Sequence, residues 1–212
     1  MRCCLAVWSS KASWHFYEEP VVESLHPWVG GTMGGTVVQV YGSGFLSSTH
    51  SFCKFGHLVV MAVRKSDSML LCASPAMSAA GAVAVEVTMN DQQYSNSSIA
   101  FEYQSMPMVR SLTPSKGPSQ GGSYVVVLGS GFSQRSSTLE YLYCRFNLTR
   151  VAATFVSESE VHCYAPDGAP GYVDVEVTNN ELDYTRSGVQ YECQCMLVTA
   201  VEPVVVAVPC LL

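Results

Sequence analysis

The sequence predicts an all-β protein built from two tandem β-sandwich repeats. Three observations lead to this prediction: a duplicated sequence, short strands in which apolar and polar residues alternate, and frequent turn residues. The 212 residues include 16 glycines and 10 prolines, which are typical of a chain with many turns. Hydrophobic residues make up 48% of the chain, enough for real cores, and no stretch has the long periodicity of an amphipathic helix.

The duplication consists of three sequence blocks that recur in the same order. Residues 20–45 match residues 107–132 at 14 of 26 positions. The two later pairs of matching blocks are 53–75 with 144–166, and 81–90 with 171–180. Three ordered blocks do not arise easily by chance, so the sequence indicates two copies of one unit.

The same period sets the expected domain boundaries. Complete repeats are expected at residues 20–104 and 107–192, with a very short linker at 104–106. Residues 1–19 resemble the end of a repeat, and residues 193–212 resemble the start of one. We therefore expect the chain to be a window cut from a longer array, with fragments of a preceding repeat and of a truncated following repeat at its two ends.

Within each repeat, the strongest strand signal is an alternation of valines with other residues. Val83, Val85 and Val87 alternate in this way, and residues 171–178 repeat the pattern. This alternation makes one face apolar and one polar, as a half-buried antiparallel strand requires. Two further pairs of valines are spaced likewise: Val38 with Val40, and Val125 with Val127. Several short strands in about 85 to 90 residues fit an immunoglobulin-like sandwich.

A glycine-rich motif, GSGF, occurs at residues 42–45 and again at 129–132. A loop of this kind binds phosphate when a helix follows it and offers its N-terminus to the anion. Here serines and then a strand follow, with no lysine. We therefore interpret the glycines as tight turns, and we expect Phe45 and Phe132 to close the ends of the two cores.

The order of these motifs resembles that of the IPT/TIG domain family. Each copy has an opening strand, a glycine pair followed by alternating valines and GSGF, and then C-x-F, C-x-x-P and VEVT-x-N. The resemblance covers both complete repeats. It implies an immunoglobulin-like β-sandwich with no catalytic role, in a family that occurs in plexins, scatter-factor receptors, fibrocystin-like proteins and Rel-type transcription factors.

Four of the nine cysteines occupy equivalent positions in the two repeats. Cys53 and Cys72 are 19 residues apart, and so are Cys144 and Cys163. We expect one disulfide in each repeat, Cys53–Cys72 and Cys144–Cys163, and the receptor members of the family carry cysteines at similar places. Buried free thiols are the alternative, but matched pairing is what an oxidising compartment would select.

The other five cysteines lie in the flanks, and no pairing is predicted for Cys3, Cys4, Cys193, Cys195 and Cys210. For Cys193 and Cys195, a metal or redox pair and a linker disulfide are both open interpretations. Two ligands alone do not make a zinc site.

Two N-x-[ST] sequons, at Asn96 and Asn147, are candidate glycosylation sites. Asn96 lies in a polar stretch that is typical of an exposed loop, and Asn147 follows the strand with Cys144 and Phe146. Together with the cysteines, the sequons favour an extracellular or cell-surface location, as part of a larger secreted or membrane-anchored protein.

Charge and motif content argue against several function classes. The net charge is −6, and no basic run is longer than Arg64-Lys65, so we expect no contact with nucleic acid or membrane. No catalytic motif is present, and we expect no enzymatic activity, cofactor or metal. His50, Cys53 and His57 form the sharpest candidate metal cluster, but the second repeat has no copy of it.

Three functions remain, and the first is favoured. A non-enzymatic adhesion or receptor-ectodomain fragment would contact a protein ligand or the neighbouring repeats of its parent chain. One alternative is a Rel-like intracellular DNA-binding and dimerisation module, for which fold resemblance is the sole support. The other is a carbohydrate-associated accessory domain of a larger enzyme, in which Trp28 or Tyr94 would stack on a sugar.

The preferred partner-contact loop is 133–143, because it holds the insertion that distinguishes the second repeat. We expect Leu139, Tyr141 and Leu142 to be exposed in this loop and to contact a partner. The alternative interpretation is that residues 139–143 extend the strand that follows.

Overall fold

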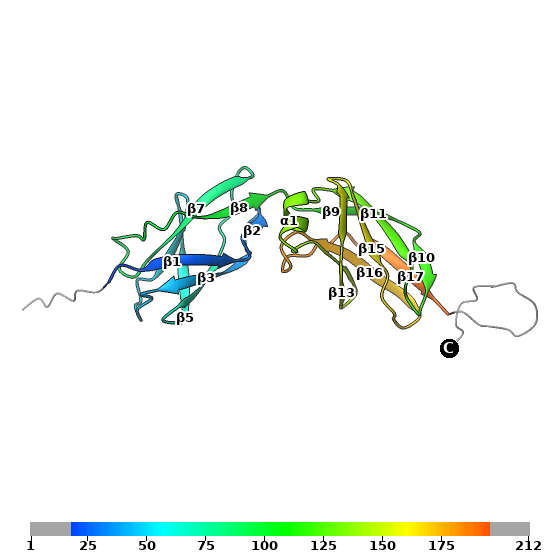
Figure 1. Ribbon diagram of the computed structural model, residues 1–212, viewed down its shortest axis with the longest axis horizontal. Helices are drawn as coiled ribbons and strands as arrows, with labels where there is room; N and C mark the ends of the chain where they lie inside the picture. The colour runs from blue at the N-terminus through cyan, green and yellow to red at the C-terminus, as the bar shows by residue number, and fades with distance from the viewer. Residues whose placement is uncertain (1–17, 196–212) are drawn as a thin grey trace, which may run out of the picture.

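The computed structural model describes residues 18–195, and Figure 1 shows them as two β-sandwiches arranged end to end. The expected all-β fold with two tandem immunoglobulin-like sandwiches is confirmed. The segments expected to belong to flanking repeats, 1–19 and 193–212, lie almost entirely outside the described residues.

Repeat 1 is one hydrogen-bonded sheet that folds over into two layers. Its strands are β1 (Val21–His26), β2 (Val29–Gly31), β3 (Val37–Ser43), β4 (Phe52–Phe55), β5 (Leu58–Ser66), β6 (Met69–Ala73), β7 (Gly81–Thr88) and β8 (Ile99–Gln104). Their order across the sheet is β1-β3-β6-β5-β4-β7-β8-β2. Because β5 pairs with β4 through its first half and with β6 through its second half, this strand carries the sheet from one layer to the other.

Repeat 2 has the same architecture in two separate sheets. Its elements are β9 (Met108–Thr113), β10 (Lys116–Pro118), β11 (Tyr124–Ser130), α1 (Gln134–Thr138), β12 (Tyr143–Phe146), β13 (Thr149–Ala152), β14 (Thr154–Ser157), β15 (Glu160–Tyr164), β16 (Gly171–Thr178) and β17 (Gln190–Gln194). The sheets are β10-β17-β16-β12-β13 and β14-β15-β11-β9. The counterpart of β5 is interrupted at Ala153, so β13 and β14 belong to different layers.

The insertion in repeat 2 forms α1, a short helix that the sequence did not predict. Ser133 caps it, since its hydroxyl accepts a hydrogen bond from the backbone N–H of Ser136 at 3.2 Å. No helix between residues 18 and 195 is long and apolar enough to span a bilayer.

The predicted valine faces form the two cores. Val38, Val40, Val85 and Val87 are fully buried in repeat 1, and Val83 packs against them partly exposed. Their counterparts in repeat 2 are also fully buried: Val125, Val127, Val175 and Val177. Each such side chain stabilises the fold by about 1.5–3 kcal/mol through removal of apolar surface from water.

The GSGF motifs are turns that close the cores, as expected. Phe45 and Phe132 are 1% and 2% exposed. Gly44 and Gly131 have left-handed backbones, with φ angles of 76° and 74°. Gly42 approaches β1 so closely that a Cβ atom there would lie 1.9 Å from the carbonyl oxygen of Val21. The left-handed backbone and the close approach to β1 therefore explain why these positions are glycines.

One disulfide joins the two layers of each sandwich. Cys53 on β4 is bonded to Cys72 on β6, with Cα atoms 6.3 Å apart. Cys144 on β12 is bonded to Cys163 on β15, with Cα atoms 6.4 Å apart. All four cysteines are at most 1% exposed, so each bond lies inside a hydrophobic core.

We predict that the double change Cys53→Ala and Cys72→Ala lowers the free energy of unfolding by about 3 kcal/mol, because the unfolded chain regains the freedom of a closed loop. Urea denaturation of the variant and of the native chain measures this loss. Reductant should destabilise the native chain more than the variant, which keeps only the disulfide of repeat 2. Equal sensitivity to reductant in the two chains would contradict a disulfide at this position.

Candidate functional site at the joint between the repeats

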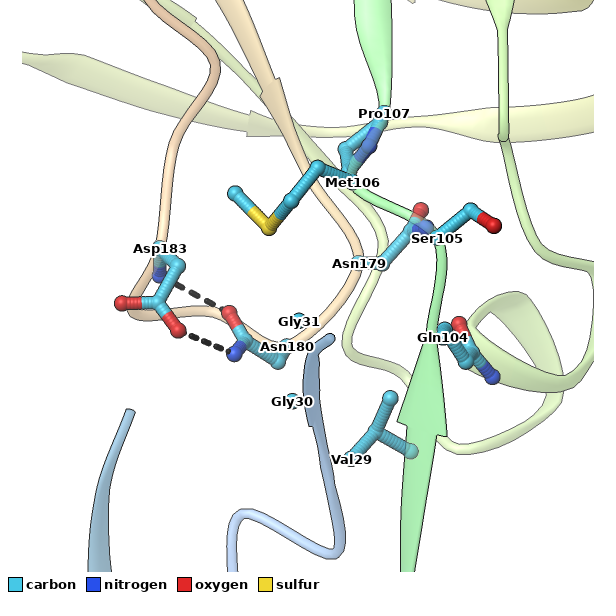
Figure 2. Close-up of a pocket in the computed structure, with 10 residues that line it drawn as sticks. All are labelled: Val29, Gly30, Gly31, Gln104, Ser105, Met106, Pro107, Asn179, Asn180 and Asp183. Carbon is cyan, nitrogen blue, oxygen red and sulfur yellow. Dashed lines mark hydrogen bonds between the residues drawn. The ribbon is translucent and has the colours of Figure 1, made fainter. Parts of the chain in front are cut away.

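The two sandwiches meet across a connection of three residues, 105–107, between the end of β8 and the start of β9. Pro107 is buried, and the side chain of Met106 extends over Gly31 of repeat 1 towards Asp183 of repeat 2 (Figure 2). A Cβ atom on Gly31 would lie 2.1 Å from the sulfur of Met106. The glycine thus leaves room for the methionine to fill the angle between the repeats.

A buried hydroxyl of repeat 1 and a carboxylate of repeat 2 form a short polar contact at the joint. Thr36, which is fully buried in repeat 1, donates from Oγ1 to Oδ2 of Asp183 in repeat 2 at 2.5 Å. Asn180 donates from Nδ2 to the same carboxylate oxygen at 2.7 Å. A hydrogen bond to a charged acceptor contributes about 1.5–3 kcal/mol, so this contact is strong enough to hold an orientation.

The loop that carries Asp183 is preorganised by its own sequence. The side-chain oxygen of Asn180 accepts hydrogen bonds from the backbone N–H groups of Leu182 and Asp183, at 3.1 and 2.8 Å. In repeat 1, Asn90 forms the same turn with Gln92 and Gln93, at 3.0 Å each. The turn is therefore common to both repeats, whereas the carboxylate that reaches across the joint is specific to repeat 2.

The inserted segment supplies further contacts from repeat 2. Arg135 in α1 forms an ion pair with Glu102 of β8. Ser136, fully buried, donates from its hydroxyl to Oε1 of Gln104 at 3.4 Å. In Figure 1, α1 lies directly beside the end of β8. The insertion thus contacts the neighbouring repeat.

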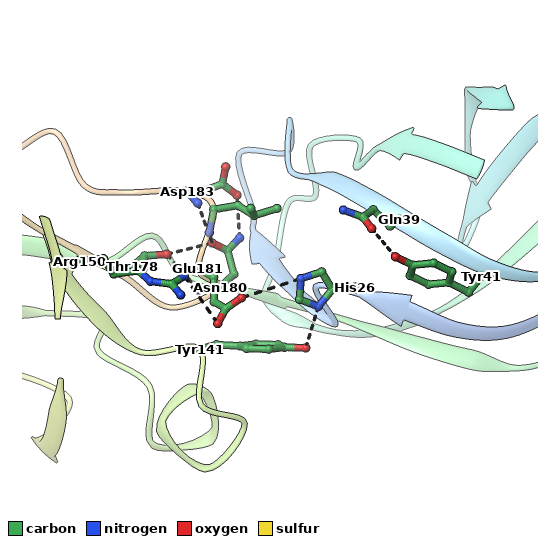
Figure 3. Close-up of polar contacts among 10 residues, drawn as sticks. His26, Gln39, Tyr41, Tyr141, Arg150, Thr178, Asn180, Glu181 and Asp183 are labelled. Atoms are coloured by element: carbon green, nitrogen blue, oxygen red, sulfur yellow. Dashed lines mark hydrogen bonds and ion pairs between the residues drawn. The ribbon is translucent and has the colours of Figure 1, made fainter. Parts of the chain in front are cut away.

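A cluster around His26 completes the joint on the side of β1 (Figure 3). The Nε2 atom of His26 lies 3.9 Å from the Glu181 carboxylate, and its Nδ1 lies 3.5 Å from the hydroxyl of Tyr141. Glu181 also lies 3.9 Å from Arg150. Burial raises the pKa of the Tyr141 phenol, the negative charge of Glu181 raises this pKa further, and a hydrogen bond with the backbone of Trp28 opposes both effects.

Close packing leaves little free space where the linker meets both repeats. The cavity between Val29, Met106 and Asn179 has a volume of about 10 Å³. That is at the lower limit for a single water molecule. Shape and polar contacts therefore both favour one relative orientation of the sandwiches.

The predicted partner-contact loop faces repeat 1 and its own core. Tyr141 is half-buried against His26, and Leu139 is the half-buried C-cap of α1. Leu142 is 3% exposed and belongs to the core of repeat 2, so the expectation that it is exposed is wrong. The insertion ends with α1, after which Leu142 is already in the inward-facing series of Cys144 and Phe146.

The other candidate residues lie away from the joint. Asn96 and Asn147 are both exposed. Cys193 is a free thiol, so a Cys193–Cys195 linker disulfide is not formed, and burial raises the pKa of the Cys193 thiol. Cys53 is in a disulfide, and between residues 18 and 195 no group of three or more His, Cys, Asp or Glu side chains could hold a metal ion.

The residues that form the joint cannot be identified from the sequence alone. Thr36 and Asp183 are 147 residues apart, and no local pattern connects them. A position-by-position comparison of the repeats offers one signal, because Asp183 replaces Gln93 in an otherwise similar turn. Arg135 and Ser136 lie in the insertion, for which the sequence predicts contact with an external partner.

Comparison with known proteins places both repeats in one family model. The model of the IPT/TIG domain matches residues 20–103 and 107–193. Fibrocystin-L of Homo sapiens is 26% identical over 173 residues, which cover 82% of this chain and 4% of that protein. Plexin-2 of Caenorhabditis briggsae is 30% identical over 142 residues, which cover 66% of this chain and 8% of that protein. The chain therefore spans less than a tenth of the length of these relatives.

A solved structure with a similar fold is the extracellular region of plexin A4. It matches with a TM-score of 0.52 and 18% identity, and the match covers 81% of this chain and 16% of the plexin chain. At this identity the similarity establishes the fold alone.

We predict that Thr36 and Asp183 are energetically coupled across the joint. In a double-mutant cycle of Thr36→Val and Asp183→Ala, unfolding by urea should give a coupling energy of about 1.5–3 kcal/mol, since each change removes the same hydrogen bond to a charged acceptor. Thr88→Val is the matched control, because Thr88 is equally buried but bonds to Asn90 within repeat 1. Coupling between Asp183 and Thr36 no larger than that with Thr88 would refute the contact.

Proposed function

The chain belongs to the IPT/TIG domain family, and from that membership we propose that it is a non-catalytic, extracellular interaction module whose two repeats act as one structural unit. The similarity to plexin and fibrocystin-L supports a receptor-like ectodomain as the parent protein. A disulfide in the core of each repeat supports an oxidising compartment.

This proposal rests on the contacts that the inserted loop of repeat 2 makes with repeat 1. Arg135, Ser136 and Tyr141 all contact repeat 1, although this loop is where the second repeat departs most from the first. Two repeats that moved independently would need no such contacts. The module therefore holds its protein-binding surfaces at a fixed mutual orientation, with the neighbouring repeat as the first partner of each sandwich.

An external protein ligand then binds to surfaces outside the insertion. The alternative of DNA binding is opposed by the net charge of −6. The alternative of sugar binding through Tyr94 is opposed by its surroundings. Its ring lies under Lys54, with the ammonium 4.6 Å from the ring centroid, and its hydroxyl donates to Asp91 at 3.4 Å. This tyrosine therefore has a structural role.

The exposed side chain and the backbone conformation of Asn147 both suit N-glycosylation. It lies at the tip of the hairpin between β12 and β13 with a φ angle of 54°, where repeat 1 has Gly56 at 61°. Asparagine tolerates this left-handed region better than most residues. The sequon continues through Leu148, which is 87% exposed, into exposed Thr149.

We predict that the chain, when secreted from a glycosylating cell, carries a glycan on Asn147, because the sequon stands exposed at a hairpin tip. Enzymatic removal of N-glycans should lower the mass of the native chain. The variant Asn147→Gln should lose one glycan, while Asn96→Gln reports the second sequon independently. A secreted native chain with no glycan at Asn147 would contradict the assignment.

We further predict that the chain does not bind duplex DNA at low salt, where electrostatic attraction to phosphate is strongest. Fluorescence anisotropy of a labelled duplex measures this directly, with a basic DNA-binding domain as the positive control. Saturable binding that weakens with added salt would favour the Rel-like alternative.

A further inference from the structure

The joint has two open sides, and they differ in chemistry. On one side, a groove of about 860 Å³ lies between the 33–35 loop of repeat 1, the linker, and residues 182–187 of repeat 2. Exposed apolar side chains line it, with exposed fractions of 78% for Met33, 39% for Met106, 49% for Met108 and 46% for Leu182. We call this groove, defined by these residues with Arg145 and Arg186, the methionine groove.

The exposed charged side chain of the methionine groove is the cation Arg186. Asp183 also lines the groove and keeps its negative charge, but this carboxylate is only partly exposed, and its Oδ2 accepts hydrogen bonds from Thr36 and Asn180. Arg145 is paired with Glu176, and its guanidinium stacks 3.9 Å from the ring centroid of Tyr184. Arg186 is exposed, and within residues 18–195 no carboxylate forms an ion pair with it. A cation thus stands free beside exposed apolar surface in a chain of net charge −6.

A second groove at the joint provides an internal comparison. This groove of about 740 Å³ is lined by serine, glutamine and aromatic side chains and by two acids, Glu102 and Glu158. Glu102 is paired with Arg135, whereas Glu158 is exposed and forms no ion pair among the described residues. The exposed charge is therefore positive in the methionine groove and negative in the second groove, and the methionines line the former.

We propose that the methionine groove docks a segment of a partner protein in which acidic and apolar side chains alternate. Apolar side chains would pack on Met33, Met106 and Met108, whose unbranched thioethers adapt to different shapes. A carboxylate of the same segment would pair with Arg186. This inference rests on the proposed function, and it assigns the partner surface to the joint because the groove has one wall from each repeat.

The proposal predicts selective binding of an acidic amphipathic peptide. Two synthetic peptides with identical leucines, one with glutamates and one with lysines between them, are titrated into the labelled two-repeat chain and followed by amide chemical shifts. The glutamate peptide should shift Met33, Met106 and Arg186 saturably, and the lysine peptide should not. Arg186→Glu should weaken the glutamate peptide roughly tenfold, since it replaces attraction by repulsion.

The matched control is Glu158→Arg, which reverses an exposed charge on the other side of the joint and should leave the glutamate peptide's affinity unchanged. Met33→Ser tests the apolar contribution at an exposed position where folding is not at risk. Absence of saturable shifts, equal shifts with both peptides, or shifts centred on Glu158 would each overturn the docking assignment. Glycosylation at Asn147 without peptide binding would reject the groove as a docking site. It would leave the proposal of an extracellular module standing.

Discussion

The link between the repeats contains only three residues, 105–107, and the arrangement of the whole molecule depends on this short length. Three extended residues span at most about 10 Å, so the ends of the two sandwiches have to touch. Touching ends bury polar groups, and each of these needs a partner within the joint. Thr36 with Asp183 and Ser136 with Gln104 meet that need for two buried hydroxyls, and Met106 fills the apolar gap between them.

The two repeats share the residues that stabilise a sandwich and differ in the residues that form the joint. The residues that they share explain folding: the valines of the cores, the GSGF turns, the asparagine turn after β7 and β16, and the disulfides between layers. The residues that differ explain the joint. Asp183 stands where repeat 1 has Gln93, and α1 exists in repeat 2 alone within the described chain. Internal duplication therefore separates residues that stabilise a sandwich from residues that connect sandwiches.

Much of the fold could be predicted because its signals are local or repeated. The alternation at Val83, Val85 and Val87 indicated which face is buried, and the equal spacing of the cysteines indicated the bonded pairs. The joint could not be predicted, because Thr36 and Asp183 are far apart in sequence and neither is unusual locally. The prediction that Leu142 is exposed is wrong for a related reason. An apolar residue after an insertion looks exposed until the length of α1 fixes where the inward-facing series of β12 resumes.

Amide nitrogen relaxation of the two-repeat chain measures whether the joint holds the two sandwiches together as one body. If the repeats are held together, both should report one elongated diffusion tensor, oriented as the end-to-end arrangement of Figure 1 requires. Two shorter and independent correlation times, one for each repeat, would mean that the contacts of Thr36, Arg135 and Tyr141 do not restrain the short linker, and would contradict the account.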